Sequence, residues 1–272
     1  MENNARNTGG SGMVGMAIKL IVVVLAAVAL YYLYRFLFGA VDGGSALLID
    51  GKQKADVDST KPITVAATAM PGIYEGGEFT VSTWIYLQNW SYRAGFNKHI
   101  LSLGGNNFDT LRLYLGANKS ALRVRLHTRD TAAVTEESPA GNLARSNFQP
   151  LFTALDTESD LLSGTGSCDL SELDLQRWIN VVVAVNGKTC DVYLDGKLTR
   201  SCVLPSFYKV DPAGYQATLL SNGGFGGFIA RTQVFGAALS PDTVYKNYMN
   251  GPEPVTGILD WLTSFFEPDR IV

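Results

Sequence analysis

Residues 178–203 read WINVVVAVNGKTCDVYLDGKLTRSCV, and this stretch decides the fold class. Its first eight residues are an almost continuous apolar run, which is typical of a strand covered on both faces. Asp195-Gly196 favours a tight hairpin turn, so the residues on either side of it are expected to pair as antiparallel strands. The pattern therefore predicts a buried strand followed by a β-hairpin.

Other segments of the chain have the same strand-like character. The stretch FTVSTWIYL alternates, which places one set of side chains on a single face, namely Phe79, Val81, Thr83, Ile85 and Leu87. The remaining candidates are ITVAAT (63–68), HILSLGG (99–105), TLRLYLG (110–116), ALRVRLHT (121–128) and GGFGGFIARTQVFGAAL (223–239). Short strands without alternating helices predict an all-β protein, an antiparallel sandwich of two sheets. A short C-terminal helix is expected at 242–249, with Ser240 as its N-cap.

Residues 13–38, MVGMAIKLIVVVLAAVALYYLYRFLF, predict a single transmembrane helix. Its length of about 39 Å is enough to cross a lipid bilayer. Lys19 and Arg35 can reach the two interfaces, and the charge distribution favours a C-terminal domain on the exported side. A cleaved signal peptide is one alternative, but the apolar core is longer than such peptides have. A helix buried in a soluble core is the other.

The sequence divides into five regions. We expect a disordered leader at 1–12, the transmembrane helix at 13–38, a glycine-rich stalk at 39–62, a sandwich domain at 63–251 and an amphipathic segment at 252–272. Within the stalk, residues 46–49 are a candidate for a short strand. A long insert, 130–167, interrupts the strands of the domain. The formal net charge of −3 argues against a surface that binds nucleic acid.

The chain contains three cysteines, Cys168, Cys190 and Cys202. No CxxC pair occurs and only two histidines are present, so a structural zinc site is not expected. Cys190 and Cys202 lie nearly opposite each other across the predicted turn. A disulfide between them is predicted for an exported domain, with Cys168 as a competing partner. In a reducing compartment all three would be small core residues.

The order of these motifs resembles the concanavalin A-like lectin/glucanase superfamily, in particular its laminin-G-like jelly-roll branch. The segments that carry the resemblance are the strand led by Trp178, VYLDGK (192–197), and ALSPD (238–242) before a helix. The resemblance covers about residues 63–250. It implies two packed antiparallel sheets, in a module that binds glycans or proteins or hydrolyses glycans.

Catalysis is not expected. Glucanases of this superfamily carry the motif E-x-D-x-x-E, and this chain has Glu172 and Asp174 but Arg177 in the last position. Hydrolysis of a glycosidic bond needs two carboxylates, so we interpret the segment as a solvated turn. No G-x-S-x-G motif occurs, and His99 and His127 lie in predicted strands as packed residues.

No cofactor is expected either, and calcium is the one alternative that the sequence leaves open. Asp156 to Asp160 imitates the start of a calcium-binding EF-hand loop, but Leu161 replaces the required glycine. We interpret the run as an ordinary acidic loop.

Several residues are candidates for surface contacts. Trp90, Tyr92 and Phe96 form an aromatic cluster that could stack on sugar rings, or pack as a rim on the domain's own core. Asn89 and Asn118 begin glycosylation sequons.

The C-terminal segment is amphipathic. One helical stripe contains Ile258, Trp261, Leu262, Phe265 and Phe266. This stripe could lie on a bilayer, dock a partner, or fold back on the sandwich.

The sequence thus predicts a membrane protein with a single-pass signal-anchor that displays a non-catalytic recognition or assembly module. A lectin-like module for carbohydrate binding is the first hypothesis. The alternative is a structural protein, a minor capsid or membrane component of a large DNA virus particle, located in the capsid layer or internal membrane of the virion. A glycoside hydrolase is a minority alternative.

Overall fold

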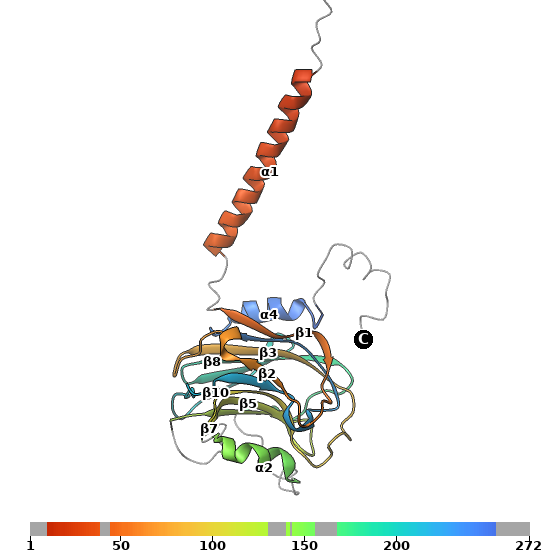
Figure 1. Cartoon of the computed structure of the whole chain (residues 1–272), viewed down its shortest axis with the longest axis vertical. Coiled ribbons are helices and arrows are strands. Elements are labelled where there is room, and N and C mark those ends of the chain that lie inside the picture. The colour runs from red at the N-terminus through yellow and green to blue at the C-terminus, as the bar shows by residue number, and fades with distance from the viewer. Residues whose placement is uncertain (1–9, 39–43, 130–139, 142, 156–167, 254–272) are drawn as a thin grey trace, which may run out of the picture. The chain divides into compact units, whose positions relative to one another are not determined.

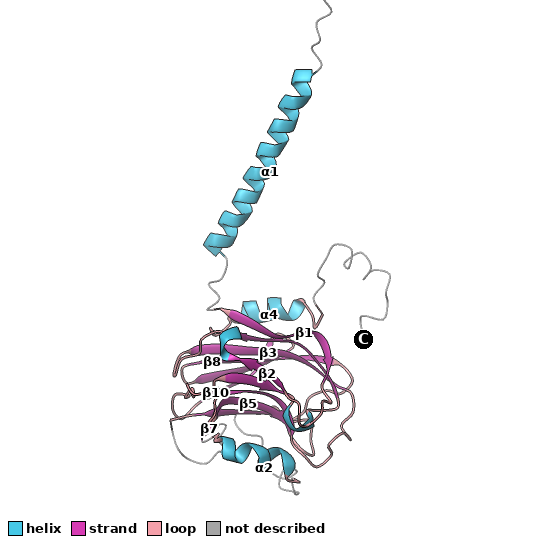
Figure 2. Ribbon diagram, in the orientation of Figure 1, coloured by secondary structure: helices cyan, strands magenta, loops and turns pink. Residues whose placement is uncertain are grey.

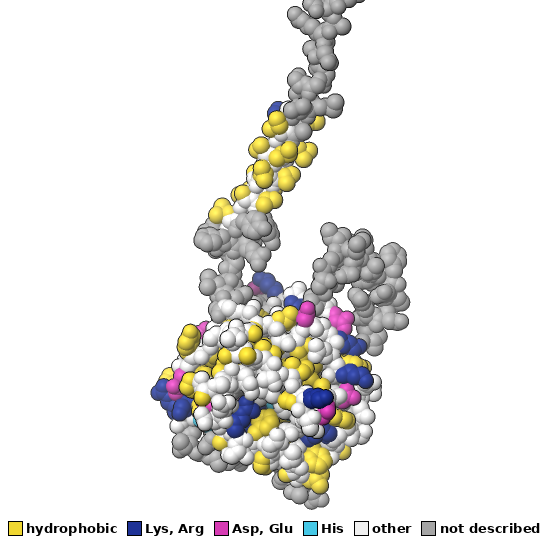
Figure 3. Space-filling model, viewed as in Figure 1, with side chains coloured by type: hydrophobic (Ala, Val, Ile, Leu, Met, Phe, Trp, Pro, Cys, Tyr) yellow, Lys and Arg dark blue, Asp and Glu magenta, His cyan; other side chains and the backbone are white. Residues whose placement is uncertain are grey.

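The computed structural model describes residues 10–38, 44–129, 140–141, 143–155 and 168–253. The chain divides into two compact units, Met1–Val41 and Asp42–Val272. The first contains one helix, α1 (Gly10–Phe38), whose large apolar side chains between Met16 and Leu33 are 44–72% exposed. They cover the described part of α1 in Figure 3. Within the described part of the chain, no helix is long and apolar enough to cross a membrane.

The second unit is a sandwich of two six-stranded sheets (Figures 1 and 2). In spatial order, the first sheet contains β1 (Ser45–Lys54), β12 (Gly227–Phe235), β3 (Glu78–Leu87), β8 (Trp178–Asn186), β9 (Thr189–Leu194) and β10 (Lys197–Val203). The second contains β2 (Ile63–Ala66), β11 (Gln216–Leu219), β4 (Lys98–Gly104), β5 (Asp109–Leu115), β6 (Leu122–His127) and β7 (Ala140–Gly141). Neighbouring strands are antiparallel except for β6 and β7. The predicted two-sheet sandwich is confirmed.

The hydrophobic core lies between the two sheets. The side chains that alternation in β3 assigns to one face, Phe79, Val81, Thr83, Ile85 and Leu87, are all buried. The Thr83 hydroxyl is the polar member of this face, and it forms a hydrogen bond with the Thr232 hydroxyl at 2.7 Å. Its burial therefore leaves no unsatisfied hydroxyl at this position.

The hairpin and the C-terminal helix also match the prediction. Asp195 and Gly196 both have positive φ, 49° and 74°, as a two-residue hairpin turn requires. The helix α4 (Pro241–Met249) begins after Ser240, whose Oγ accepts a hydrogen bond from the Thr243 backbone N–H at 3.3 Å. This cap satisfies one of the free N–H groups of the first turn.

Two helices cover the outer faces of the sandwich (Figure 1). On the outer face of the first sheet, Val244 of α4 packs with Val182, Tyr193 and Phe235. On the outer face of the second sheet, Phe148 and Phe152 of α2 (Phe148–Thr153) pack on Tyr114 of β5. The short 3-10 helices are η1 (Ala67–Ala69), η2 (Arg145–Asn147) and η3 (Ser221–Gly223).

The short strand expected at 46–49 is observed, but it is longer than predicted, and residues 45–54 belong to the sandwich and not to a stalk. These residues form β1, an edge strand of the first sheet that pairs with β12. Ala46 and Ile49 are buried, and Ile49 belongs to the core between the sheets. The glycines that suggested a stalk are compatible with a strand, because Gly51 sits in a bulge of the β1–β12 pairing with φ of 67°.

Candidate ligand-binding groove

The outer face of the second sheet is polar. Strand alternation sends every second side chain of this sheet away from the core. One register row crosses five strands on this face and consists of Thr64, Thr218, Ser102, Arg112 and Arg125. Such a row needs partners wherever it is covered, because a buried polar group without one is costly.

A short cap, η2 with α2, covers part of this face. Phe148 and Phe152 lie edge-on to the His99 ring, with ring centroids 5.3 and 5.2 Å apart. Arg145 of the cap reaches Asp109 of β5, with Nη2 and Oδ1 3.1 Å apart. Arg112 contacts the other oxygen of this carboxylate at 2.6 Å. Asp109 thus ties the cap to the sheet.

Burial fixes the protonation of the histidine beneath the cap. Burial, together with the nearby Arg112 and Arg145, lowers the pKa of His99 well below its usual range, so the ring is neutral. Its Nδ1 accepts a hydrogen bond from the Ser221 backbone N–H at 3.0 Å. The packed role predicted for His99 is confirmed, and its ring supports the η3 turn.

A groove of about 550 Å³ opens beside the cap. Its walls come from the loop before β2, from β2 and β11, from η3 and from the cap. The lining residues are Ser59, Thr60, Pro62, Thr64, Arg145, Phe148, Gln149, Gln216, Thr218, Ser221 and Asn222. Hydroxyl and amide groups predominate, with one aromatic ring and one charged side chain. The size is within the usual range for ligand pockets.

Two lining residues have buried polar atoms without a partner. Thr218 is 6% exposed and Asn222 is 8% exposed. Within the described part of the chain, neither Thr218 Oγ1 nor Asn222 Nδ2 forms a hydrogen bond. Each such group costs about 1–3 kcal/mol of stability unless water or a ligand satisfies it. The groove therefore offers hydrogen-bonding capacity that the fold itself leaves unused.

The turn that carries Asn222 has an unusual backbone. Leu220 and Asn222 have φ of 56° and 55°, in the left-handed region. This conformation is uncommon for a bulky residue such as leucine and costs about 1–3 kcal/mol. Strain of this kind clusters at functional sites. It coincides here with the unpartnered amide, which makes the groove our candidate site.

The predicted aromatic cluster lies outside this groove. Trp90 is half-buried against the core, with Lys98 Nζ 4.2 Å from its ring centroid. The Arg93 guanidinium carbon, Cζ, lies 5.5 Å from the ring centroid of Phe96. These contacts favour the interpretation of a rim packed on the core. Tyr92 supports the η3 turn, since its hydroxyl donates to the Gly223 carbonyl at 2.9 Å. It also lines a separate hollow of about 300 Å³.

Among the described residues, the two glycosylation candidates do not line the groove. Asn89 is exposed, and its Oδ1 accepts hydrogen bonds from Ser91 N at 2.9 Å and Ser91 Oγ at 2.7 Å. Asn118 is half-buried in the turn after β5. Glycosylation of either stays a prediction. The acidic run Asp156 to Asp160 and the stripe with Trp261, Phe265 and Phe266 lie outside the described residues.

The glucanase-like segment is a solvated turn, as predicted. Glu172 and Asp174 are exposed and belong to no strand. Arg177 forms ion pairs with Asp174 at 2.7 Å and with Asp195 at 2.8 Å. In a strand, residues two apart lie on the same face, and this is how the glucanase motif aligns its first two carboxylates. Glu172 and Asp174 lie outside any strand, so this alignment does not apply to them.

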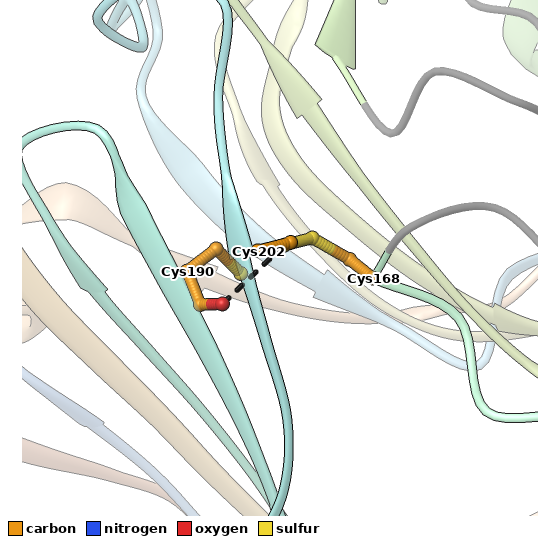
Figure 4. Close-up of side chains that lie close together, drawn as sticks. All are labelled: Cys168, Cys190 and Cys202. Atoms are coloured by element: carbon orange, nitrogen blue, oxygen red, sulfur yellow. Dashed lines mark hydrogen bonds between the residues drawn. A yellow bond between two sulfur atoms is a disulfide. The ribbon is translucent and has the colours of Figure 1, made fainter.

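The predicted Cys190–Cys202 disulfide is wrong, because the disulfide joins Cys168 to Cys202 (Figure 4). Cys190 and Cys202 are directly opposite in the β9–β10 register, as expected, but both side chains belong to the core between the sheets. There they meet Cys168, which precedes the bridge of Leu170 to Leu122 in the second sheet. The bond therefore connects β10 of the first sheet to the turn that leads into this bridge. Burial raises the pKa of the remaining thiol, Cys190, to about 12.

Sequence reasoning did not identify the groove. Its central residues, Thr218 and Asn222, lie in QATLLSNGG (216–224), a segment that was assigned to no strand apart from its last two glycines. A signal was present in the alternation of Gln216 and Thr218 with apolar residues, followed by a Ser-Asn-Gly-Gly turn. The contribution of the cap could not be seen, because it depends on contacts between segments far apart in the chain.

Comparison with known proteins finds similarity in structure alone. No family model and no curated protein matches the chain. Similar solved structures include the receptor binding domain of botulinum neurotoxin D, with TM-score 0.49 and 15% identity, covering 76% of this chain and 48% of that one. The serotype D ligand binding domain in complex with N-acetylneuraminic acid has a TM-score of 0.48 and 14% identity, and the match covers 76% of this chain and 46% of that one. The type G receptor binding domain has a TM-score of 0.45 and 14% identity, and the match covers 77% of this chain and 45% of that one.

This chain thus spans less than half the length of each of these domains. Similarity at this level carries no assignment of function. Membership of the concanavalin A-like superfamily stays a prediction, while the sandwich itself is observed.

Proposed function

We propose that the sandwich is a non-catalytic carbohydrate-binding module and that its ligand occupies the groove beside the cap. The observation that carries this proposal is the pair of unpartnered polar atoms, Thr218 Oγ1 and Asn222 Nδ2, in a groove lined by hydroxyl and amide groups. Sugars present many hydroxyls that donate and accept hydrogen bonds. Phe148 supplies an apolar wall, against which the C–H face of a sugar ring can pack.

A binding role suits the groove better than hydrolysis. The lining residues include no aspartate, glutamate, histidine or cysteine. Glycoside hydrolysis needs an acid and a second carboxylate on either side of the bond. The groove can therefore hold a glycan by hydrogen bonds but lacks the groups to cleave it.

We further propose that α1 attaches the module to a lipid bilayer, with the sandwich on the exported side. Support comes from the exposed aliphatic side chains between Met16 and Leu33, because so large an apolar surface is unfavourable in water. The Cys168–Cys202 disulfide is compatible with an exported, oxidising location.

Protein assembly is a second candidate function, and the edge strand β10 favours it. Leu198 and Val203 on this strand are 52% and 75% exposed. An open edge with apolar side chains is a surface on which another chain can pair. Replacing both residues with lysine should leave the sandwich folded and reduce association in light scattering. Unchanged association would remove β10 from consideration.

A glycan array tests the main proposal with two matched variants. Thr218→Val removes the unpartnered hydroxyl of a residue that lines the groove, with little change in shape. Thr110→Val does the same to another unpartnered buried hydroxyl of this sheet that does not line the groove. We expect the parent protein and Thr110→Val to bind the same glycans, and Thr218→Val to bind at least about tenfold more weakly. No glycan binding, or equal loss in both variants, would contradict the proposal.

A further inference from the structure

The groove has a single charged lining residue, Arg145. Its side chain is 24% exposed. Nε donates to the Gly105 carbonyl at 2.9 Å, and Nη2 contacts Asp109 at 3.1 Å. Nη1 forms no hydrogen bond within the described part of the chain. One arm of the guanidinium thus stays available at the groove wall.

The charges beneath this wall do not balance. Two arginines, Arg112 and Arg145, share the single carboxylate of Asp109. His99 is neutral and adds no charge. Among the described residues, one positive charge therefore remains uncompensated in a largely buried cluster, where an unbalanced charge is unfavourable.

The rim of the groove does not supply the missing negative charge. Asp58 is exposed beside the lining residues, and its carboxylate accepts hydrogen bonds from Thr60 N at 3.0 Å and Thr60 Oγ1 at 2.8 Å. Lys61 is exposed on the same loop and carries the opposite charge. Since solvent screens both, the rim is close to neutral, and the surplus at Arg145 decides the potential of the groove.

From this imbalance we infer that the glycan carries a carboxylate, so that the groove selects acidic saccharides over their neutral counterparts. The inference rests on the proposed carbohydrate-binding function. A sugar carboxylate placed at Arg145 Nη1 would form a charge-assisted hydrogen bond and neutralise the cluster. Hydroxyls of the same sugar would remain free to meet Thr218 and Asn222.

Charge variants at Gln149 test the inference without disturbing the fold. Gln149 lines the groove and is exposed on α2, and its side chain forms no hydrogen bond or ion pair within the described part of the chain. We expect Gln149→Glu to weaken binding of an acidic glycan about fivefold and Gln149→Lys to strengthen it by a similar factor. The probes are the acidic glycans that bind on the array, each compared with the same glycan after its carboxylate is reduced to an alcohol.

The outcomes separate this inference from the proposal on which it rests. Reduction of the carboxylate should lower affinity at least about tenfold and abolish the response to both Gln149 variants. If neutral glycans bind as tightly as acidic ones and Thr218→Val still abolishes binding, the groove binds carbohydrate but the selectivity for acids is wrong. If no glycan binds in a way that depends on Thr218, both ideas fail.

Discussion

At the scale of single residues, Thr218 and Thr110 present the same chemical group in two settings. Both hydroxyls are buried in the second sheet without a partner, and only Thr218 lines the groove. Valine removes the unsatisfied hydroxyl at almost constant volume. We therefore expect each substitution to raise the free energy of unfolding by about 1 kcal/mol in chemical denaturation. A destabilised Thr218→Val protein would mean that the hydroxyl already has a partner.

The environment of His127 leads us to expect a lower free energy of unfolding in mild acid. Its Nδ1 accepts a hydrogen bond from the Leu143 backbone N–H at 2.9 Å. Burial, then the nearby Lys209, lower the pKa of His127 to about 4, with Asp211 opposing. The unfolded chain takes up this proton near pH 6.5, so the stability from this group is complete above pH 6.5 and lost as the pH falls toward 4.

We expect His127 to account for about 1 kcal/mol of the stability lost between pH 7 and pH 5, after allowance for partial solvent contact. His127→Gln keeps an acceptor for Leu143 but cannot take up the proton. Its unfolding curves should depend less on pH than those of the parent. An identical pH dependence would assign the effect to other groups, of which His99 is the first.

At the scale of elements, Phe152 is the most deeply buried aromatic side chain of the cap. Phe152 is fully buried, and its ring lies 5.6 Å from that of Tyr114 and 5.0 Å from that of Phe148. Phe152→Ala should lower the free energy of unfolding by about 3 kcal/mol. Leu155→Ala, at an exposed position that follows the same helix, should change it by less than about 0.5 kcal/mol. Equal effects in denaturation would show that the cap does not pack as described.

Elements with a strong local signal were predictable. The alternation in β3, the Asp195-Gly196 turn and the Ser240-Pro241 start of α4 each act over a few neighbouring residues, and each was correct. What the sequence predicted in part or not at all depends on distant partners. Only a short strand at 46–49 was expected, and its extension to the whole of β1 depends on pairing with β12. The helix α2 has only six residues, too few for a helical period to be visible.

At the scale of the whole molecule, the disulfide joins β10 to the turn before the Leu170–Leu122 bridge and leaves one thiol buried. Peptide mapping of native protein should find Cys168 linked to Cys202, with Cys190 alkylated only after unfolding. Cys168→Ser should lower the free energy of unfolding by about 2–4 kcal/mol, because the unfolded chain loses a cross-link. A disulfide-linked Cys190–Cys202 peptide from the parent protein would contradict the Cys168–Cys202 pairing and support the one predicted from the hairpin register.

The proposed attachment to lipid is also tested on the whole chain. The boundary between the two units falls after Val41 in the sequence, so a protein without residues 1–41 keeps the entire sandwich. We expect the full chain to float with liposomes on a density gradient and the shortened protein to stay in the dense fractions. Flotation of the shortened protein would place the lipid contact elsewhere, with the C-terminal segment as the next candidate.

The most direct test of the central claim is a crystal structure of the sandwich with a glycan identified on the array. We predict ligand oxygens in the groove within hydrogen-bonding distance of Thr218 Oγ1 and Asn222 Nδ2, because the fold leaves these two atoms unsatisfied. A glycan seated in the hollow beside Tyr92, with the groove occupied by water alone, would contradict the account.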